Sequence, residues 1–353
     1  MTRTERIKAL EALGRERILI LDGAMGTQIQ TYALEEDDFR GDRFKQSNVP
    51  LKGNNDLLSI TRPEIIKAIH GTFFDAGADI AGTNTFSSTQ IAQADYALES
   101  AAGEIARAGA KIAREVADEY EEKTGAPKAV MGAIGPTNRT LSLSPDVEDP
   151  GYRAVTFDEV HDSYAEQCEA MADYVDFFLI ETVFDTLNAK AAIKSVLDLR
   201  AEGRVPEDIP IVLSGTITDA SGRTLSGQTT EAFYNSVRHA KPWAVGLNCA
   251  LGAKAMRQYV QEMSRIAETR IITYPNAGLP NAFGEYDETP CQTAGFIGDW
   301  AQSGLVNIVG GCCGTTPAHV KAIAEAALKG EPRVIPDRHS AMRLSGLEPF
   351  EVA

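Results

Sequence analysis

The residues best suited to chemistry in this 353-residue sequence are three cysteines at the ends of two predicted strands. Cys249 closes the segment GLNC, and Cys312 and Cys313 stand side by side after two glycines in VGGCCGTT. Adjacent cysteines can hardly pair with each other, so a metal ion explains them better than a disulfide. Three thiolates that leave one position open are typical of a catalytic zinc site.

Core packing is the alternative interpretation for any single cysteine, because a free thiol fits well among apolar side chains. We assign that role to Cys168 and Cys291, which lack a comparable context. For the glycine-flanked pair Cys312 and Cys313, matched by Cys249, metal binding is the favoured interpretation. The helix predicted to follow the pair would stabilise nearby thiolates with the positive end of its dipole.

Eight short apolar segments are predicted strands, and each is followed by a polar loop and a helical pattern. These strands begin at residues 17, 78, 128, 175, 209, 243, 270 and 306. Eight such units predict an α/β fold, a (β/α)8 TIM-type barrel that forms a single domain over residues 1–328. An open doubly wound sheet is the alternative, but no GxGxxG motif with a following acid comes after the first strand.

Long polar loops follow several predicted strands, whereas the turns from helix back to strand are short. In a barrel all of these loops gather at the C-terminal end, where active sites are built. The sixth and eighth strands are next-but-one neighbours in that arrangement, so Cys249 could reach the same ion as Cys312 and Cys313. The long loops cover residues 31–60, 135–157, 215–230 and 276–290.

The helix predicted over residues 61–77 carries clear local signals. Thr61 and Glu64 fit a capping box, Pro63 suits the first turn, and Gly77 suits the end. Two helices show an apolar face at helical spacing. These faces are Ile65, Ile69 and Phe73 in the first helix, and Val320, Ile323, Ala327 and Leu328 in the one that begins near Thr316 and Pro317.

Charge and composition exclude several classes of partner. The 34 Lys and Arg against 50 Asp and Glu give a formal net charge of −16, which opposes binding to nucleic acid or to an anionic membrane. No apolar run reaches the roughly 18 residues of a membrane span, and the charged N-terminus has no signal-peptide core. We therefore expect a cytoplasmic protein whose cysteines stay reduced.

Longer blocks of the sequence resemble the homocysteine-binding module of cobalamin-dependent methionine synthase, within the wider homocysteine S-methyltransferase family. The resemblance extends from about residue 15 to the closing RLSGLEPF, and the blocks include LDGAMGTQIQ, GADIAGTNTF, LIETVFDTLNAKAA, GLNCALG, PNAGLPNAFGEYD and VNIVGGCCGTTP. It implies Zn²⁺ on Cys249, Cys312 and Cys313, with the homocysteine sulfur in the fourth position. A thiol near pKa 8.5 loses its proton on coordination, so the site would generate a nucleophile without a separate protein nucleophile.

The resemblance also directs attention to the other residues of the predicted site. Asn276, at the end of the seventh strand, could supply the fourth zinc ligand before substrate binds. Asp22 and Glu181, acids at the ends of apolar strands, are our candidates for the homocysteine ammonium group. For the homocysteine carboxylate the candidates are the backbone N–H groups of Gly23 and Ala24, together with Thr83, Asn84 and Thr85.

The methyl donor is predicted from what the sequence contains. No DxHxxG cobalamin-ligand motif is present, so we expect methylcobalamin to be held by a partner protein, with a further folate-binding subunit. Residues 329–353 resemble the linker toward a folate-binding domain. The alternatives are a cobalamin-independent enzyme that uses betaine or a sulfonium donor and a non-catalytic zinc- or homocysteine-binding protein. A phosphate-binding barrel that uses the GGCCGTT turn would leave the three cysteines unexplained.

Overall fold

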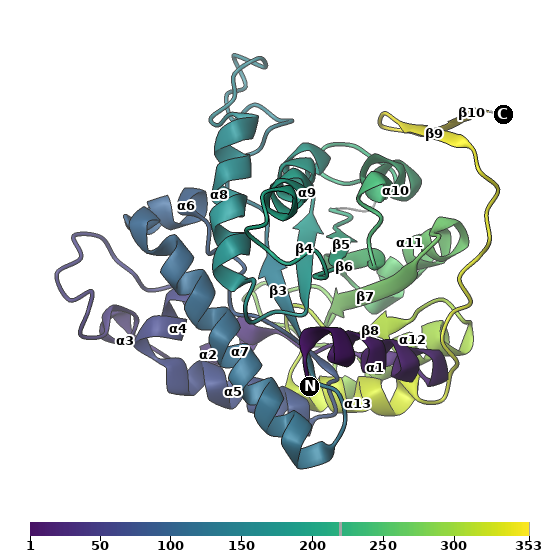
Figure 1. Ribbon diagram of the computed structural model, residues 1–353, viewed down its shortest axis with the longest axis horizontal. Coiled ribbons are helices and arrows are strands. Elements are labelled where there is room, and N and C mark those ends of the chain that lie inside the picture. The colour runs from purple at the N-terminus through teal and green to yellow at the C-terminus, as the bar shows by residue number, and fades with distance from the viewer. Residues whose placement is uncertain (219–220, 353) are drawn as a thin grey trace.

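The computed structural model describes residues 1–218 and 221–352, and its main feature is one parallel sheet closed into a barrel (Figure 1). The eight predicted strands are confirmed, and they pair in the order β1-β8-β7-β6-β5-β4-β3-β2. A parallel bridge from Leu21 to Ile80 joins β1 to β2 and completes the ring. The strands are β1 (Leu19–Ile20), β2 (Ile80–Gly82), β3 (Ala129–Ile134), β4 (Phe177–Val183), β5 (Ile211–Gly215), β6 (Ala244–Gly252), β7 (Arg270–Asn276) and β8 (Ile308–Val309).

Helices surround the sheet, as expected for strand–helix units in a single α/β domain (Figure 1). They are α1 (Arg3–Glu16), α2 (Met25–Gln30), α3 (Glu36–Arg40), α4 (Leu58–Thr61), α5 (Pro63–Asp75), α6 (Gln90–Gln93), α7 (Ala102–Thr124), α8 (Phe157–Met171), α9 (Thr186–Ala201), α10 (Thr230–Val237), α11 (Ala253–Ile266), α12 (Pro290–Gln302) and α13 (Pro317–Ala327). Short 3-10 turns are η1 (Asn55–Leu57), η2 (Ala94–Tyr96), η3 (Glu99–Ala101) and η4 (Arg238–Ala240). Across the described ranges, no helix combines the length and apolarity that crossing a membrane requires. Asp219 and Ala220, within the predicted loop 215–230, and Ala353 lie outside the described residues.

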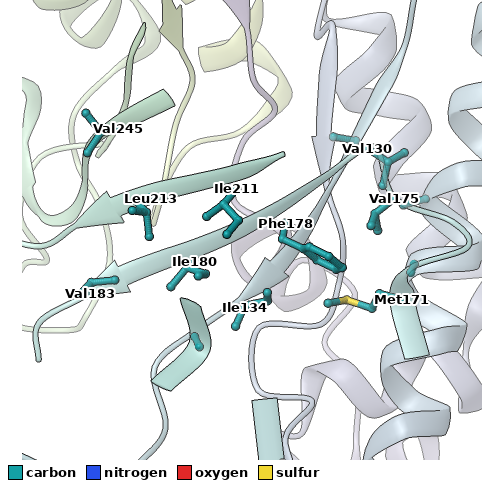
Figure 2. Close-up of a cluster of buried hydrophobic side chains, with 14 of the residues drawn as sticks. Val130, Ile134, Met171, Val175, Phe178, Ile180, Val183, Ile211, Leu213 and Val245 are labelled. Atoms are coloured by element: carbon teal, nitrogen blue, oxygen red, sulfur yellow. The ribbon is translucent and has the colours of Figure 1, made fainter. Parts of the chain in front are cut away.

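The core has two apolar layers, because successive side chains of a strand point to opposite faces. Phe178 and Ile180 of β4 belong to the cluster that faces the helices, and Figure 2 shows Phe178 beside Met171 of α8. Phe177 and Leu179 of the same strand belong instead to the cluster inside the barrel. One strand thus contributes both to the barrel interior and to the contact with the surrounding helices.

The N-terminal end of the barrel is closed by α1 through apolar contacts and buried charges. Leu10 of α1 is fully buried in the interior cluster. Arg6, which is 4% exposed, donates to Glu121 at 2.9 Å and to Asp176 at 2.8 Å. Arg114 of α7 donates to the second oxygen of Asp176 at 2.9 Å. Each buried charge therefore has a partner, which offsets the cost of removing it from water.

The local signals of two predicted helices are only partly confirmed. The capping box of Thr61 and Glu64 is wrong, because Thr61 ends α4 and Arg62 occupies the N-cap of α5 without a side-chain capping bond. Gly77 does follow α5 with a φ of +103°, a conformation that glycine adopts without strain. The two predicted apolar faces pack in the core except for Leu328, which lies just past α13 and is 57% exposed.

The segment that follows α13 stays in contact with the barrel. Its β9 (Met342–Ser345) and β10 (Pro349–Val352) form an antiparallel hairpin that packs against α10 (Figure 1). The buried Arg333 side chain donates to the carbonyl of Thr269 at 2.8 Å and to that of Ala267 at 2.6 Å. The Ser345 hydroxyl donates to the Ala232 carbonyl at 2.6 Å.

Arg6→Ala is expected to lower the free energy of unfolding by up to about 3–5 kcal/mol, because it removes one of the two cations that pair with each of the buried carboxylates of Glu121 and Asp176. Urea unfolding followed by circular dichroism measures the change. Lys67→Ala is the control, since Lys67 and Glu119 form an exposed pair, and it should cost less than about 1 kcal/mol. Equal losses in both variants would contradict a special role for the buried network.

Candidate active site

A cavity of about 630 Å³ opens at the C-terminal end of the barrel and contains most of the predicted site. Its wall is formed by residues at or just after the ends of several strands, together with parts of the loops that follow them. The predicted residues that line it are Asp22, Gly23, Ala24, Thr83, Asn84, Glu181, Cys249, Cys312 and Cys313. Thr85 and Asn276 lie outside the cavity wall.

The three cysteines from β6 and from the loop after β8 converge at this cavity. Their sulfur atoms all lie within 4.8 Å of one another, and the Sγ atoms of Cys249 and Cys313 are 3.8 Å apart. All five cysteines of the chain are free thiols. Cys168 is buried, as predicted for a packing residue, but Cys291 is exposed, so its predicted packing role is wrong. The end of β7 supports the pair, because Cys312 N donates to the Pro275 carbonyl at 2.8 Å and Ala277 N donates to the Cys313 carbonyl at 2.9 Å.

The geometry of the three sulfurs fits a tetrahedral metal ion. A zinc–sulfur bond of about 2.3 Å in tetrahedral coordination places two ligand sulfurs about 3.8 Å apart. The separation of the Cys249 and Cys313 sulfurs matches this value. Zinc is also one of the metal ions that bind thiolate ligands well, unlike Mg²⁺ and Ca²⁺, which prefer oxygen ligands. The residues present could therefore hold zinc.

The sulfurs influence each other's protonation strongly. Hydrogen bonds from Cys249 and Cys312 hold the pKa of the Cys313 thiol far below its ordinary value. Hydrogen bonds with Cys249 and Cys313, together with burial, raise the pKa of Cys312. Negative charge in the cluster is therefore shared among three neighbouring sulfurs, and a cation placed between them would stabilise it.

Backbone conformation at the site is unusual in both flanking strands. Cys249 and Ala250 have φ of +59° and +56°, and Thr182 next to Glu181 has φ of +56°. Each costs of order 1–2 kcal/mol in a non-glycine residue. The register of β6 against β7 shifts between Asn248 and Gly252, so this part of β6 bulges. The register of β4 against β5 also shifts, between Ile180 and Val183.

Two predicted carboxylates line the same cavity, Asp22 just after β1 and Glu181 on β4, in addition to Asp56 and Asp95. Burial raises the pKa of Glu181 to about 7, although a hydrogen bond of 2.8 Å from the Tyr274 hydroxyl lowers it in part. Burial also raises the pKa of Asp22 well above its ordinary value, against a hydrogen bond of 2.9 Å from Gly82 N. Within the described residues the cavity wall contains no Lys or Arg. A ligand cation would therefore find two carboxylates without a protein counter-ion.

Several residues predicted for the substrate carboxylate already have partners. The Ala24 N–H donates to Thr315, and the Thr83 hydroxyl accepts from Ala133 N at 2.9 Å. Thr85 is fully buried and donates to the Ala133 carbonyl at 2.8 Å, so it is unsuited to contact substrate. The Asn84 amide donates to the Asn55 carbonyl at 2.9 Å. These hydrogen bonds support the surrounding loops, while Ala24, Thr83 and Asn84 still line the cavity.

Gly23 is different, because a side chain cannot be accommodated at this position. A Cβ atom there would lie 2.7 Å from the Phe73 ring and 3.1 Å from the Thr315 hydroxyl. Glycine is therefore required for packing against Phe73 and Thr315, and Gly23 lines the cavity directly beside Asp22. Of the residues predicted for the carboxylate, Gly23 is the best placed.

Asn276 lies beside the cysteine pair at the end of β7. Its side chain is 3% exposed, and its Oδ1 atom has no hydrogen-bond partner among the described residues. The peptide groups on both sides of it bond to Cys312 and Cys313. A buried acceptor without a donor is costly, and a metal ion would satisfy it.

Two residues of this region were not found from the sequence. Tyr274, two residues before Asn276 on β7, donates to Glu181. Asn248 precedes Cys249 and bonds to Thr182 on β4. A polar residue inside an otherwise apolar strand was the only available signal in both cases, and its partner could not be identified without the strand order.

Comparison with known proteins agrees with the barrel fold and shows the family. Structures of the homocysteine methyltransferase MmuM from Escherichia coli cover 91% of this chain and 99% of their own. The oxidized form has a TM-score of 0.70 at 20% identity, and the metallated form 0.69 at 22%, so this likeness concerns the fold. The family model for homocysteine S-methyltransferase matches residues 19–327. The chain therefore belongs to the homocysteine S-methyltransferase family.

Proposed function

We propose that this protein uses zinc to transfer a methyl group to the thiolate of L-homocysteine and so forms L-methionine. The observation that carries the proposal is one cavity that joins three converging sulfurs to the carboxylates of Asp22 and Glu181, with no Lys or Arg among the described residues of its wall. The sulfurs suit a metal and the carboxylates suit an ammonium group. An amino acid with a thiol side chain presents both partners at once.

In this proposal zinc is held by Cys249, Cys312 and Cys313. The unpartnered Oδ1 of Asn276 supports its role as fourth ligand before substrate binds. Bound zinc would keep the substrate sulfur as a thiolate at neutral pH, where a thiol of pKa about 8.5 is mostly protonated. A reducing compartment such as the cytoplasm suits three neighbouring thiols.

The amino-acid end of homocysteine is proposed to bind between β1 and β4. Asp22 and Glu181 accept hydrogen bonds from the ammonium group, and Gly23 N–H donates to the carboxylate. Tyr274 orients Glu181 by donating to one of its oxygens at 2.8 Å. An ammonium ion beside Glu181 favours the ionised carboxylate, so substrate binding offsets the desolvation that raises the pKa of Glu181 in the free protein.

Methylcobalamin on a partner protein is the proposed methyl donor. The support is the long run of sequence blocks that resemble the cobalamin-dependent enzyme, a resemblance that also suggests a folate-binding subunit. The division into a barrel of residues 1–328 and an extension of residues 329–353 that leads toward a folate-binding domain is part of the same proposal. Betaine or a sulfonium compound is the alternative donor.

The donor assay tests the function directly. Zinc-loaded protein is given homocysteine with methylcobalamin, betaine or S-methylmethionine in separate reactions, and methionine is quantified. Methionine from methylcobalamin, with the cobalamin spectrum changing to the demethylated form, supports the proposal. Methionine formed only from betaine or S-methylmethionine would identify a cobalamin-independent enzyme. Tight homocysteine binding without any product would indicate a binding protein.

Zinc binding is expected to weaken by more than about 100-fold in each of Cys249→Ala, Cys312→Ala and Cys313→Ala, because each variant loses one of three protein thiolates. Loss of a residue that only orients a ligand typically weakens metal binding by about 10–100-fold. Zinc competition with a chromogenic chelator measures the loss, and circular dichroism should show an intact barrel. Cys291→Ala is the matched control, since Cys291 is an exposed thiol. A variant that keeps the original zinc affinity would remove its cysteine from the ligand set.

Glu181→Gln is expected to weaken homocysteine binding about 10–100-fold, the equivalent of a charge-assisted hydrogen bond of about 1.5–3 kcal/mol. Calorimetric titration of the zinc-loaded protein measures it. Glu121→Gln changes another partly buried carboxylate, at the opposite end of the barrel, and should leave the affinity unchanged. An unaltered affinity in Glu181→Gln would exclude the ammonium role.

The same contact predicts a dependence of homocysteine affinity on pH. Glu181 in the free protein has a pKa of about 7, so below that pH its carboxyl is neutral and attracts an ammonium group less strongly. Affinity should therefore rise as pH increases through about 7, and Glu181→Gln should lose this part of the dependence. Identical pH profiles for the two proteins would show that another group, such as the substrate thiol, accounts for all of it.

A further inference from the structure

Asn248 occupies a central position between the two parts of the site. It is fully buried on β6, immediately before Cys249, and is absent from the cavity wall. Its Oδ1 atom accepts from Thr182 N at 3.1 Å and from the Ser214 hydroxyl at 2.6 Å. Its Nδ2 donates to the Thr182 hydroxyl at 2.8 Å. One side chain therefore joins β6 to β5 and β4.

Asn248 bonds to one residue with left-handed backbone and directly precedes another. Thr182, on β4, has φ of +56°, and Cys249 has φ of +59°. Such conformations persist in non-glycine residues only where the surroundings hold them. Asn248 bonds both the N–H and the hydroxyl of Thr182, and its own carbonyl accepts from the Thr216 hydroxyl at 2.9 Å. The peptide that enters Cys249 is thereby fixed from β5.

These contacts lie directly beside two functional side chains. The register of β6 shifts directly after Asn248, and that shift turns Cys249 toward the cavity. Glu181 faces the same cavity by ordinary alternation, since Leu179 two residues earlier lies in the barrel interior, and the register of β4 shifts between Ile180 and Val183, beside it. Without the Asn248 amide, β6 could return to regular pairing, which would turn Cys249 away from the cavity, and the irregular segment of β4 beside Glu181 would lose its anchor.

We infer that Asn248 is a positioning residue that holds Cys249 and Glu181 in register with each other, and so couples metal affinity to homocysteine affinity. The inference rests on the proposed function, in which the first residue binds zinc and the second binds the ammonium group. Asn248 acts through its neighbours, because its own side chain does not line the cavity.

Asn248→Ala tests the inference. Zinc affinity, measured by competition with a chromogenic chelator, is expected to fall about 10–100-fold, as is usual when a group that orients a ligand is removed. The cobalt-substituted protein should show a weaker thiolate-to-cobalt charge-transfer band, because Cys249 is no longer held toward the metal. Homocysteine affinity of the zinc-loaded variant should fall as well, since Glu181 loses the same support.

Asn307→Ala is the matched control. Asn307 is also a buried asparagine next to a strand, and its Oδ1 accepts from Ile271 N at 2.9 Å while its Nδ2 donates to the Arg333 carbonyl at 2.9 Å. Its bonds lie at the other end of the barrel, so this variant should lose stability but keep zinc affinity and the charge-transfer band. Equal effects of both variants on the metal would overturn the inference, because they would reflect general destabilisation.

Ser214→Ala and Thr216→Val provide milder variants in case Asn248→Ala does not fold. Each removes one hydrogen bond to Asn248 and should weaken zinc binding by less, but in the same direction. Unchanged zinc affinity in these variants and in folded Asn248→Ala overturns the inference alone, provided that the unsubstituted protein binds zinc tightly. Failure of the unsubstituted protein to bind zinc overturns the proposed function together with the inference.

Discussion

Closure of the parallel sheet is the constraint on which the site depends. In a closed parallel barrel every strand ends at the same rim, so residues far apart in sequence become neighbours there. Cys249 and Cys313 are separated by 64 residues, yet their sulfurs are 3.8 Å apart. Asp22 from β1 and Glu181 from β4 reach the same cavity. The opposite end is closed by α1 with its buried ion pairs, which leaves one open end for ligands.

Charge in the cavity has one sign. Sulfurs that share protons and carboxylates with raised pKa lie together, and the described part of the wall supplies no Lys or Arg. Burial makes ionised carboxylates unfavourable in such a site when no ligand is bound, and it is the main cause of the raised pKa of Glu181, with the neighbouring Cys313 sulfur adding to it. Cationic ligands reverse the balance. A metal ion would stabilise the sulfurs, and an ammonium group would stabilise the carboxylates. A small amino acid with a thiol side chain, as proposed above, could therefore contact both parts of the cavity.

Backbone strain at the rim of the barrel lies at residues whose side-chain direction matters for the site. Three non-glycine residues next to the site have left-handed backbone, and both strands that carry them lose regular pairing there. Side chains of a regular strand alternate between its two faces, so in a regular β6 Cys249 could not point toward the cavity. Bulges change that direction at the cost of backbone energy, and buried hydrogen bonds such as those of Asn248 keep them in place.

The sequence by itself determined the strands, the barrel class and the residue types at the rim, because apolar runs and the polar ends that follow them are local properties. Cys249, Cys312, Cys313, Asp22 and Glu181 could all be named from such local patterns. Only the tertiary structure decided which polar groups remain free for a ligand. Ala24 N–H and Thr85 are already bonded to other loops, and Thr61 belongs to α4 instead of capping α5. Asn248 acquires its role from a partner 66 residues away, and a hydrogen bond over that separation exists only once the strands are placed side by side.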